Sequence, residues 1–389
     1  MITPEVAYFD NAATTYIKPT EVHDFMHSFY SMNSINLRRT NHELSQNSVN
    51  IVSDTRKMLL KLFNAGTDYS VVFTATATEA INIILQGQNF HKTLNVYISP
   101  FEHNAVYRTL KYLEKLNKIN IYELSVNKET LEFEFDKITY QFSQNYPDLV
   151  VVSHVSNVTG CISPIIKLGT LVNKTGSKFL IDCAQSAGIL EIDINQCHAD
   201  YIIFAGHKTL YGPFGCSGFV CKKTADLKPL IYGGTGLDSQ KESMPTEIPE
   251  RFEAGSFNIL SLSGLYAALK WHEVTGKDKI YNTEINNYNR LYNLLSSFDY
   301  ITIKGVRNNS ISIISVLFKD IPSDIAGNIL LNNHVITRTG LQCAPLAHKF
   351  IDTYPAGTIR FSISYFTSDD DFITLKNALK QIKEDIHEF

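Results

Sequence analysis

The 389-residue sequence lacks the marks of several protein classes. It has no long run of Lys or Arg, and a formal net charge of −4 leaves no basic surface for nucleic acid or an anionic membrane. It has no stretch of about 18 uninterrupted apolar residues, and its first residues, MITPEVAYFDNAATT, do not form a basic segment followed by an apolar one. We therefore expect a cytoplasmic protein that binds neither nucleic acid nor membrane.

Cysteine is present, but its spacing does not suit a metal or a disulfide framework. The sequence has no C-x-x-C pair and no His-rich spacing around its six cysteines, which are Cys161, Cys183, Cys197, Cys216, Cys221 and Cys343. We expect reduced thiols, most of them buried as small apolar side chains, and no metal site.

What the sequence does contain is an alternation of short apolar runs and helical patterns between residues 69 and 220. The runs SVVF, NVYIS, DLVVVS, KFLID and YIIFA are short and rich in β-branched residues, which is typical of buried strands. Residues 104–117 carry apolar side chains at helical spacing, as expected for a helix that connects two strands. This alternation predicts an α/β sheet with helices on its faces.

The pattern changes after Asn258. Long helical stretches around Trp271 and Tyr288 precede the runs SISIISVLF and GTIRFSISYF, with further helices near residues 325–332 and from Asp369. This order predicts a second, smaller α+β domain. Between the two parts, residues 233–255 are polar and have little periodicity, and a loop of that length usually has a function or contacts a neighbour.

Polar residues follow several predicted strands, at the edge where α/β sheets bind ligands. In TATATEAIN, the N–H groups near Ala77 and Thr78 begin a helix and suit a phosphate, with the Thr78 hydroxyl as a further donor. The alternative is an ordinary capped helix start with Glu79 in its first turn. His103 follows NVYIS, where its ring either covers a flat ligand, caps a helix or fills the core. Asn157 follows DLVVVS, either as a ligand-binding group or as a turn residue.

Two further positions complete this set. Asp182 ends KFLID with Gln185 three residues later, and this carboxylate either meets a cation or caps a helix. Lys208, in FAGHKTLYGPFGC, follows the run YIIFA and by itself resembles an exposed turn lysine. A phosphate site, a ring-covering imidazole, a strand-end aspartate and an amine are together what pyridoxal 5'-phosphate requires. The combination predicts that Lys208 holds this cofactor covalently.

Nine motifs, spread over nearly the whole chain, resemble the class V aminotransferase superfamily and, within it, the cysteine desulfurases. They are YFDNAATT, TATATEAIN, EHNAVYR, SHVSNVTGCISPI, IDCAQSAG, FAGHKTLYGPFG, RFEAGSFN, RTGLQCAPLAH and GTIRFSISYF. The resemblance implies the α/β fold-type I architecture of pyridoxal phosphate enzymes. A large domain with a mixed, mainly parallel sheet would span residues 16–258, and a smaller α+β domain would combine residues 1–15 and 259–389. Such enzymes are usually homodimers.

The resemblance also implies roles at the cofactor ring. Lys208 is similar to the lysine that carries the cofactor, and Asp182 to the partner of its ring nitrogen. Gln185 is similar to the donor to the ring hydroxyl, and His103 to the stacking histidine that also moves protons.

Further roles concern the phosphate and the substrate. The backbone of Ala77, together with Thr78 and His207, resembles a phosphate cup, and Ser256 matches a residue supplied by the neighbouring subunit. Asn157 and Arg360 resemble the groups that bind the substrate carboxylate, for which the planar fork of an arginine is suited.

Cys343, in RTGLQCAPLAH, resembles the nucleophile of the group II desulfurases, whose active-site loop is compact. One more buried cysteine is the alternative, but a polar loop with a proline is a poor place to bury one. Three residues depart from the family pattern. Ala77 replaces a frequent polar residue, Ala205 a hydroxyl residue and Gln342 a frequent histidine, and we expect the last change to make the thiol less reactive.

The activity implied is that of a cysteine desulfurase. It would convert L-cysteine to L-alanine, hold the sulfur as a persulfide on Cys343 and pass it to a sulfur-acceptor protein. Selenocysteine is an alternative substrate, because its carbon–selenium bond is weaker. Three other functions stay open: a selenocysteine lyase, another class V carbon–sulfur lyase or aminotransferase, and a non-catalytic protein that binds a sulfur carrier.

Overall fold

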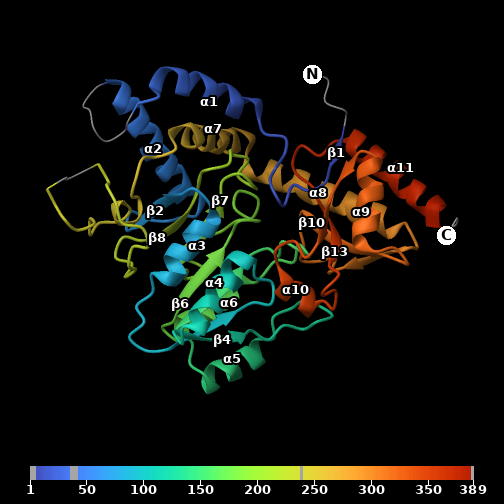
Figure 1. The fold of residues 1–389 in the computed structure, drawn as a ribbon, viewed down its shortest axis with the longest axis horizontal. Coiled ribbons are helices and arrows are strands. Elements are labelled where there is room, and N and C mark those ends of the chain that lie inside the picture. Colours follow the sequence, from blue (N-terminus) through green and yellow to red (C-terminus); the bar gives the residue numbers. More distant parts are fainter. Residues whose placement is uncertain (1–5, 36–42, 237–239, 387–389) are drawn as a thin grey trace.

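A computed structural model describes residues 6–35, 43–236 and 240–386. Two parts follow one another along the chain, a large part built on a seven-stranded sheet and a smaller part built on a four-stranded sheet (Figure 1). The α/β fold class expected from the sequence is confirmed.

The seven-stranded sheet has the order β2-β8-β7-β6-β5-β3-β4. Only β8 runs against its neighbours; the others are parallel. The strands are β2 (Tyr69–Thr74), β3 (Leu94–Ile98), β4 (Ile119–Glu123), β5 (Leu149–Ser153), β6 (Lys178–Asp182), β7 (Tyr201–Ala205) and β8 (Ser217–Lys222). All the predicted runs in this region became strands of the sheet.

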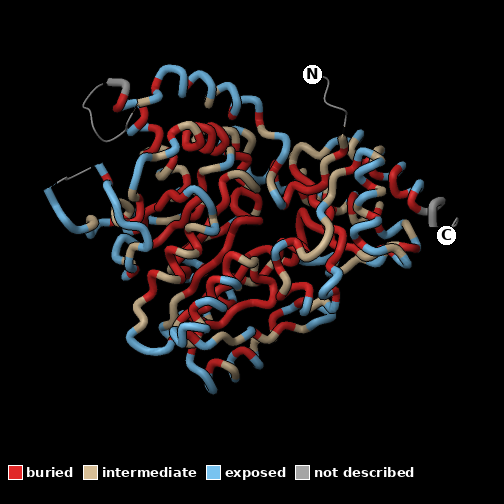
Figure 2. Tube along the Cα trace, in the orientation of Figure 1, coloured by how far each residue is buried: buried red, intermediate tan, exposed pale blue. Residues whose placement is uncertain are grey.

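Alternate residues of each central strand enter two different apolar cores. In β5, Val150 and Val152 belong to one core, whereas Leu149 and Val151 belong to the other. Because successive side chains of a strand point to opposite faces, the sheet is buried on both faces, as Figure 2 shows along its strands. The helices that connect these strands are α3 (Ala77–Gln86), α4 (Asn104–Lys115), α5 (Phe135–Gln144) and α6 (Ile165–Lys174).

The smaller part has an antiparallel sheet with the order β12-β13-β10-β9. Its strands are β9 (Ile301–Lys304), β10 (Ile313–Phe318), β12 (Arg338–Gly340) and β13 (Thr358–Ser362). Its helices are α8 (Lys277–Ser296), α9 (Ser323–Asn332) and α11 (Asp369–Ile386), while α10 (Pro345–Phe350) packs Leu346 and Ala347 into the two cores of the large sheet. The N-terminal strand β1 (Ala7–Tyr8) pairs with β11 (Val335–Ile336), so the start of the chain packs into this part.

Helix α7 (Ile259–Thr275) lies against α1 (Thr20–Asn33) and α2 (Glu43–Leu62), as Figure 1 shows. Its apolar side chains, such as Leu262 and Leu265, enter one core of the large sheet. By packing, α7 therefore belongs with the large part, while the division at residues 15 and 258 stays a prediction. The predicted loop at residues 233–255 is irregular apart from one short turn of helix, and its residues 237–239 lie outside the described part.

Among the described residues, none of the helices has the length and apolar character needed to cross a membrane.

Candidate active site

The carboxyl ends of the parallel strands bring the predicted site residues to one edge of the large sheet. Asp182 is the last residue of β6, and Lys208 follows β7, the next strand in the sheet. His103 follows β3, and Asn157 follows β5. Chain segments more than 100 residues apart in sequence thus meet at one edge, because parallel strands of one sheet end on the same side.

Lys208 lies in a tight turn, and both its backbone N–H and its backbone carbonyl are hydrogen-bonded. Its N–H donates to the carbonyl of Ala205 at 3.3 Å, and its own carbonyl accepts the Thr15 hydroxyl at 2.8 Å. Within the described part of the chain, its amine has no hydrogen-bonded partner. Burial lowers the pKa of this amine, and the negative charge of Asp182 opposes that shift. The turn therefore fixes the backbone of Lys208 and leaves its amine free to bind a ligand.

Asp182 is buried, and its Oδ1 accepts the Ala184 N–H at 2.9 Å. Burial raises the pKa of this carboxyl, whereas the N–H of Ala184 and the charge of Lys208 lower it. Gln185, also buried, donates through Nε2 to the carbonyl of Ala12 at 2.8 Å. One amide donor of Gln185 is thus already engaged by the N-terminal segment.

The start of α3 has free backbone donors. Thr76 is the N-cap and accepts the Glu79 N–H at 3.1 Å, while the Glu79 carboxylate accepts the Ala75 N–H at 2.9 Å. The N–H groups of Ala77 and Thr78 belong to the first turn of α3 and have no acceptor within the helix. Such free N–H groups at a helix start favour the binding of an anion. The structure therefore shows the helix start, and the phosphate role of Ala77 and Thr78 stays a prediction with which these free N–H groups are compatible.

His207 and Ser256 occupy different surroundings. The His207 ring stacks on Phe214 with centroids 4.5 Å apart, and its Nδ1 lies 3.1 Å from the Thr14 hydroxyl. Burial, followed by the nearby charges of Lys208 and Lys18, lowers the pKa of His207 to about 3, so its ring is neutral. Ser256 is exposed just before α7, and its role toward a neighbouring subunit stays a prediction.

His103 is both a helix cap and a member of the site. Its Nδ1 accepts the Ala105 N–H at 3.0 Å, so the neutral ring carries its proton on Nε2. Burial lowers the pKa of His103 to about 4, and the charges of Lys208 and Arg360 add to this shift. A neutral imidazole with a proton on Nε2 is thus the form present at neutral pH.

Arg360, in β13, is almost fully buried. One terminal nitrogen donates to the Asn157 carbonyl at 3.0 Å, and the other forms a buried ion pair with Asp10. Its Nε has no partner among the described residues. Burial lowers the pKa of the guanidinium, and Asp10 opposes that shift. A buried donor without a partner is what an incoming carboxylate would satisfy.

Cys343 is the exposed cysteine of the chain, whereas the other five are buried as expected. Its backbone and that of Gln342 are left-handed, with φ of 58° and 39°. For residues other than glycine such a conformation costs on the order of 1–3 kcal/mol and persists only where the surroundings impose it. Here the Gln342 carbonyl accepts Asn157 Nδ2, and the Cys343 carbonyl accepts the Asn104 N–H, each at 2.7 Å.

The Cys343 thiol lies near the lysine and the arginine of the site. A negative charge on Cys343 raises the pKa of both Lys208 and Arg360. Asn157 and Asn104 bond the backbone carbonyls of Gln342 and Cys343. These bonds hold the cysteine loop against the edge of the large sheet. Asn157, expected to bind a ligand, contacts the cysteine loop with its side chain and Arg360 with its carbonyl.

Two residues near the site were missed from the sequence. Asp10 lies within YFDNAATT, yet nothing local links it to an arginine 350 residues away. Glu102 lies in EHNAVYR and is fully buried, where its carboxyl accepts hydrogen bonds from Ser99 and Ser153. Burial raises the pKa of Glu102 to about 8. The local signal for Glu102 is its position directly before His103, just after an apolar strand.

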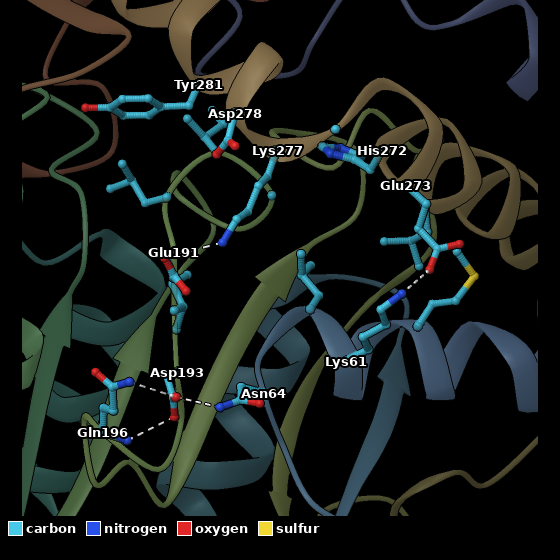
Figure 3. A pocket seen from close by; sticks show the side chains of 18 residues that line it. Lys61, Asn64, Glu191, Asp193, Gln196, His272, Glu273, Lys277, Asp278 and Tyr281 are labelled. Atoms are coloured by element: carbon cyan, nitrogen blue, oxygen red, sulfur yellow. Dashed lines mark hydrogen bonds and ion pairs between the residues drawn. The ribbon is translucent and has the colours of Figure 1, made fainter.

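A separate hollow of about 930 Å³ lies between the ends of α2 and α7, the start of α8 and residues 188–196 (Figure 3). Four of its charged side chains form two ion pairs, Lys61–Glu273 at 3.1 Å and Lys277–Glu191 at 3.4 Å. None of the predicted site residues lines it. We therefore place the candidate active site at the sheet edge.

Comparisons with known proteins identify the family. The family model described as Aminotransferase class-V matches residues 7–375. A probable cysteine desulfurase of Pyrococcus abyssi is 32% identical over 98% of this chain and 95% of its own length. A cysteine desulfurase of Escherichia coli O8 is 30% identical over 97% of this chain and 93% of its own length.

A solved structure of a cysteine desulfurase has a similar fold. The apo structure of a cysteine desulfurase from Thermococcus onnurineus NA1 has a TM-score of 0.89 at 26% identity, covering 97% of this chain and 94% of that one.

Proposed function

The chain belongs to the class V aminotransferase family, and on that premise we propose that it is a pyridoxal-phosphate-dependent cysteine desulfurase. The observation that carries the proposal is the exposed cysteine Cys343, whose loop is held near Lys208 and Arg360 by bonds from Asn104 and Asn157 to its backbone carbonyls. An aminotransferase or a simple lyase has no use for a thiol in that position.

The residues present fit pyridoxal 5'-phosphate. The Lys208 amine has no hydrogen-bonded partner in the described chain, Asp182 is a buried carboxylate on the adjacent strand, and Ala77 and Thr78 leave backbone donors free. When bound, the cofactor would supply an electron sink that stabilises negative charge on the substrate carbon. Lys208 would hold it, Asp182 would keep its ring nitrogen protonated, and the start of α3 with His207 would receive its phosphate. Gln185 would donate to its ring hydroxyl.

Each of the remaining residues has one task. Arg360 binds the carboxylate of L-cysteine, because its Nε is a buried donor without a partner. Asn157 holds the cysteine loop and orients Arg360 through its carbonyl. His103 covers the cofactor ring and moves the proton that its neutral ring carries on Nε2.

Cys343 accepts the sulfur. Its thiolate forms a bond to the substrate sulfur, the bond from that sulfur to Cβ breaks, and Cβ gains a proton to give L-alanine. The sulfur stays on Cys343 as a persulfide. A sulfur-acceptor protein then receives it at the exposed side chain.

Several finer properties belong to the same proposal. The enzyme works as a homodimer in which Ser256 reaches the cofactor phosphate of the neighbouring subunit, and it acts in the cytoplasm. Selenocysteine is an alternative substrate.

Incubation with L-cysteine and a reductant tests the function. Equal amounts of alanine and sulfide are expected. After treatment with L-cysteine without the reductant, mass spectrometry should show added sulfur on the Cys343 peptide, which later addition of a reductant removes. Pyruvate and ammonia instead would identify a lyase, and no conversion by the cofactor-loaded protein would refute catalysis.

A further inference from the structure

The side chain of Gln342 is buried and bonds to the small sheet and to α10. Its Nε2 donates to the Thr358 carbonyl at 2.9 Å and to the Arg338 carbonyl at 3.3 Å. Its Oε1 lies 2.7 Å from Nε2 of His348, in α10. Because the amide nitrogen faces carbonyl groups, Oε1 is an acceptor, and His348 must carry a proton on Nε2.

The opposite side of the His348 ring is also occupied. Its Nδ1 lies 2.7 Å from the Thr353 hydroxyl, which therefore donates to it. Burial, helped by the charge of Arg360, lowers the pKa of His348 to about 4, so the ring is neutral at physiological pH. Gln342 and His348 thus form a buried, uncharged pair. Hydrogen bonds at both ring nitrogens fix the tautomer and the orientation of the imidazole.

This pair is attached to the strained peptide that carries the nucleophile. Gln342 and Cys343 are consecutive left-handed residues, and neither is a glycine. Their carbonyls meet donors of the large part, Asn157 Nδ2 and the Asn104 N–H. The backbone is thus held from the large part, while the Gln342 side chain is anchored in the small part.

We propose that Gln342 and His348 are positioning residues for the Cys343 thiol. By anchoring one end of the strained peptide, they keep both carbonyls on Asn157 and Asn104 and keep the thiol near Lys208 and Arg360. Neither residue touches the substrate or the cofactor; both act through the backbone of Cys343. The proposal rests on the proposed desulfurase function, which supplies the task of that thiol.

Two variants remove the anchor. Gln342→Met keeps the length of the side chain but removes its amide, and His348→Leu removes the donor to Oε1. We expect kcat for alanine formation to fall by about 10²-fold, because a displaced nucleophile loses its alignment. KM for L-cysteine should stay close to the wild-type value, because Arg360 and Lys208 are not altered.

A second readout does not depend on catalysis. Hydrogen exchange at the Asn104 amide should become about tenfold faster in both variants, since its acceptor is the Cys343 carbonyl. Exchange in the rest of α4 should not change. A purely structural role for the pair would instead loosen the small part broadly and leave this amide no more affected than others.

Two further variants serve as matched controls. His348→Gln places an amide donor where Nε2 was and should recover most of kcat and of the Asn104 protection. Asn309→Ala removes another side-chain amide bond between the two parts, from Asn309 Nδ2 to the Ile162 carbonyl at 2.9 Å, away from the cysteine loop. It should leave both readouts at the wild-type level.

The proposal is overturned if Gln342→Met and His348→Leu keep wild-type protection of Asn104 and wild-type kcat. It is also overturned if His348→Gln is impaired as severely as His348→Leu. Failure of the desulfurase function would appear separately, as a wild-type enzyme that makes no alanine, and the exchange measurement would still decide the positioning role.

Discussion

The Asp10–Arg360 ion pair joins the start of the chain to β13 and allows a quantitative prediction. The side chains of Arg360 and Asp10 are only 4% and 11% exposed. Asp10→Ala would leave the guanidinium buried without its counter-charge, with the Asn157 carbonyl as its remaining polar partner. Removing one partner of a buried pair costs about 3–5 kcal/mol. We expect the free energy of unfolding to fall by an amount in that range.

Urea titrations at equal cofactor saturation, followed by circular dichroism, measure this loss. The matched control is Asp54→Ala, which breaks the Lys57–Asp54 pair on α2, where the side chains are 72% and 46% exposed. An exposed pair contributes about 0–1 kcal/mol, so the control should be nearly neutral. Equal losses in the two variants would show that burial of the Asp10–Arg360 pair does not set its contribution, and the reasoning would be refuted.

Three further predictions concern single residues. Cys343→Ser should still bind L-cysteine but release sulfur orders of magnitude more slowly, with selenocysteine cleavage less affected; wild-type alanine production by this variant would make the thiol structural. Lys208→Ala should lose the absorption of the lysine-bound cofactor and the borohydride-trapped adduct, and a wild-type spectrum would contradict the assignment. Burial raises the pKa of Glu284 from 4.5 to about 7, so the folded state binds an extra proton between these values and stability falls as pH rises through that window. Glu284→Gln should therefore be stabilised relative to wild type by up to about 3 kcal/mol above pH 7, and a difference that does not change with pH would reject this account.

Much of this site was predictable because its signals are local. Lys208, Asp182 and His103 each follow a short apolar run, and the alternation of runs and helices already implied a parallel sheet whose strand ends meet. For His103 and Thr78 the structure shows the roles at a helix start, and their ligand-binding roles stay predictions that are compatible with it. The His103 ring caps α4 while it belongs to the site, and Thr78 begins a capped helix whose N–H groups remain free.

The contacts that could not be predicted join segments far apart in the sequence. Asp10 and Arg360 are 350 residues apart, and Asn157 meets Gln342 across 185. Such pairs depend on how the two sheets sit against each other, which no local pattern records. The position of α7 has the same origin. It directly follows the change of pattern at Asn258, and its packing against α1 and α2 joins it to the large part.

The three departures from the family pattern differ in weight once the atoms they affect are known. At Ala77 the proposed phosphate donor is a backbone N–H, which any residue except proline supplies. The Gln342 side chain bonds to His348 and Thr358. A glutamine in place of a histidine therefore affects the Cys343 thiol through the position of the backbone. Ala205 is different, because it is buried at the end of β7 and its carbonyl accepts the Lys208 N–H. A hydroxyl at Ala205 would add a donor next to the lysine turn, so of the three departures this one removes a side-chain donor from the site.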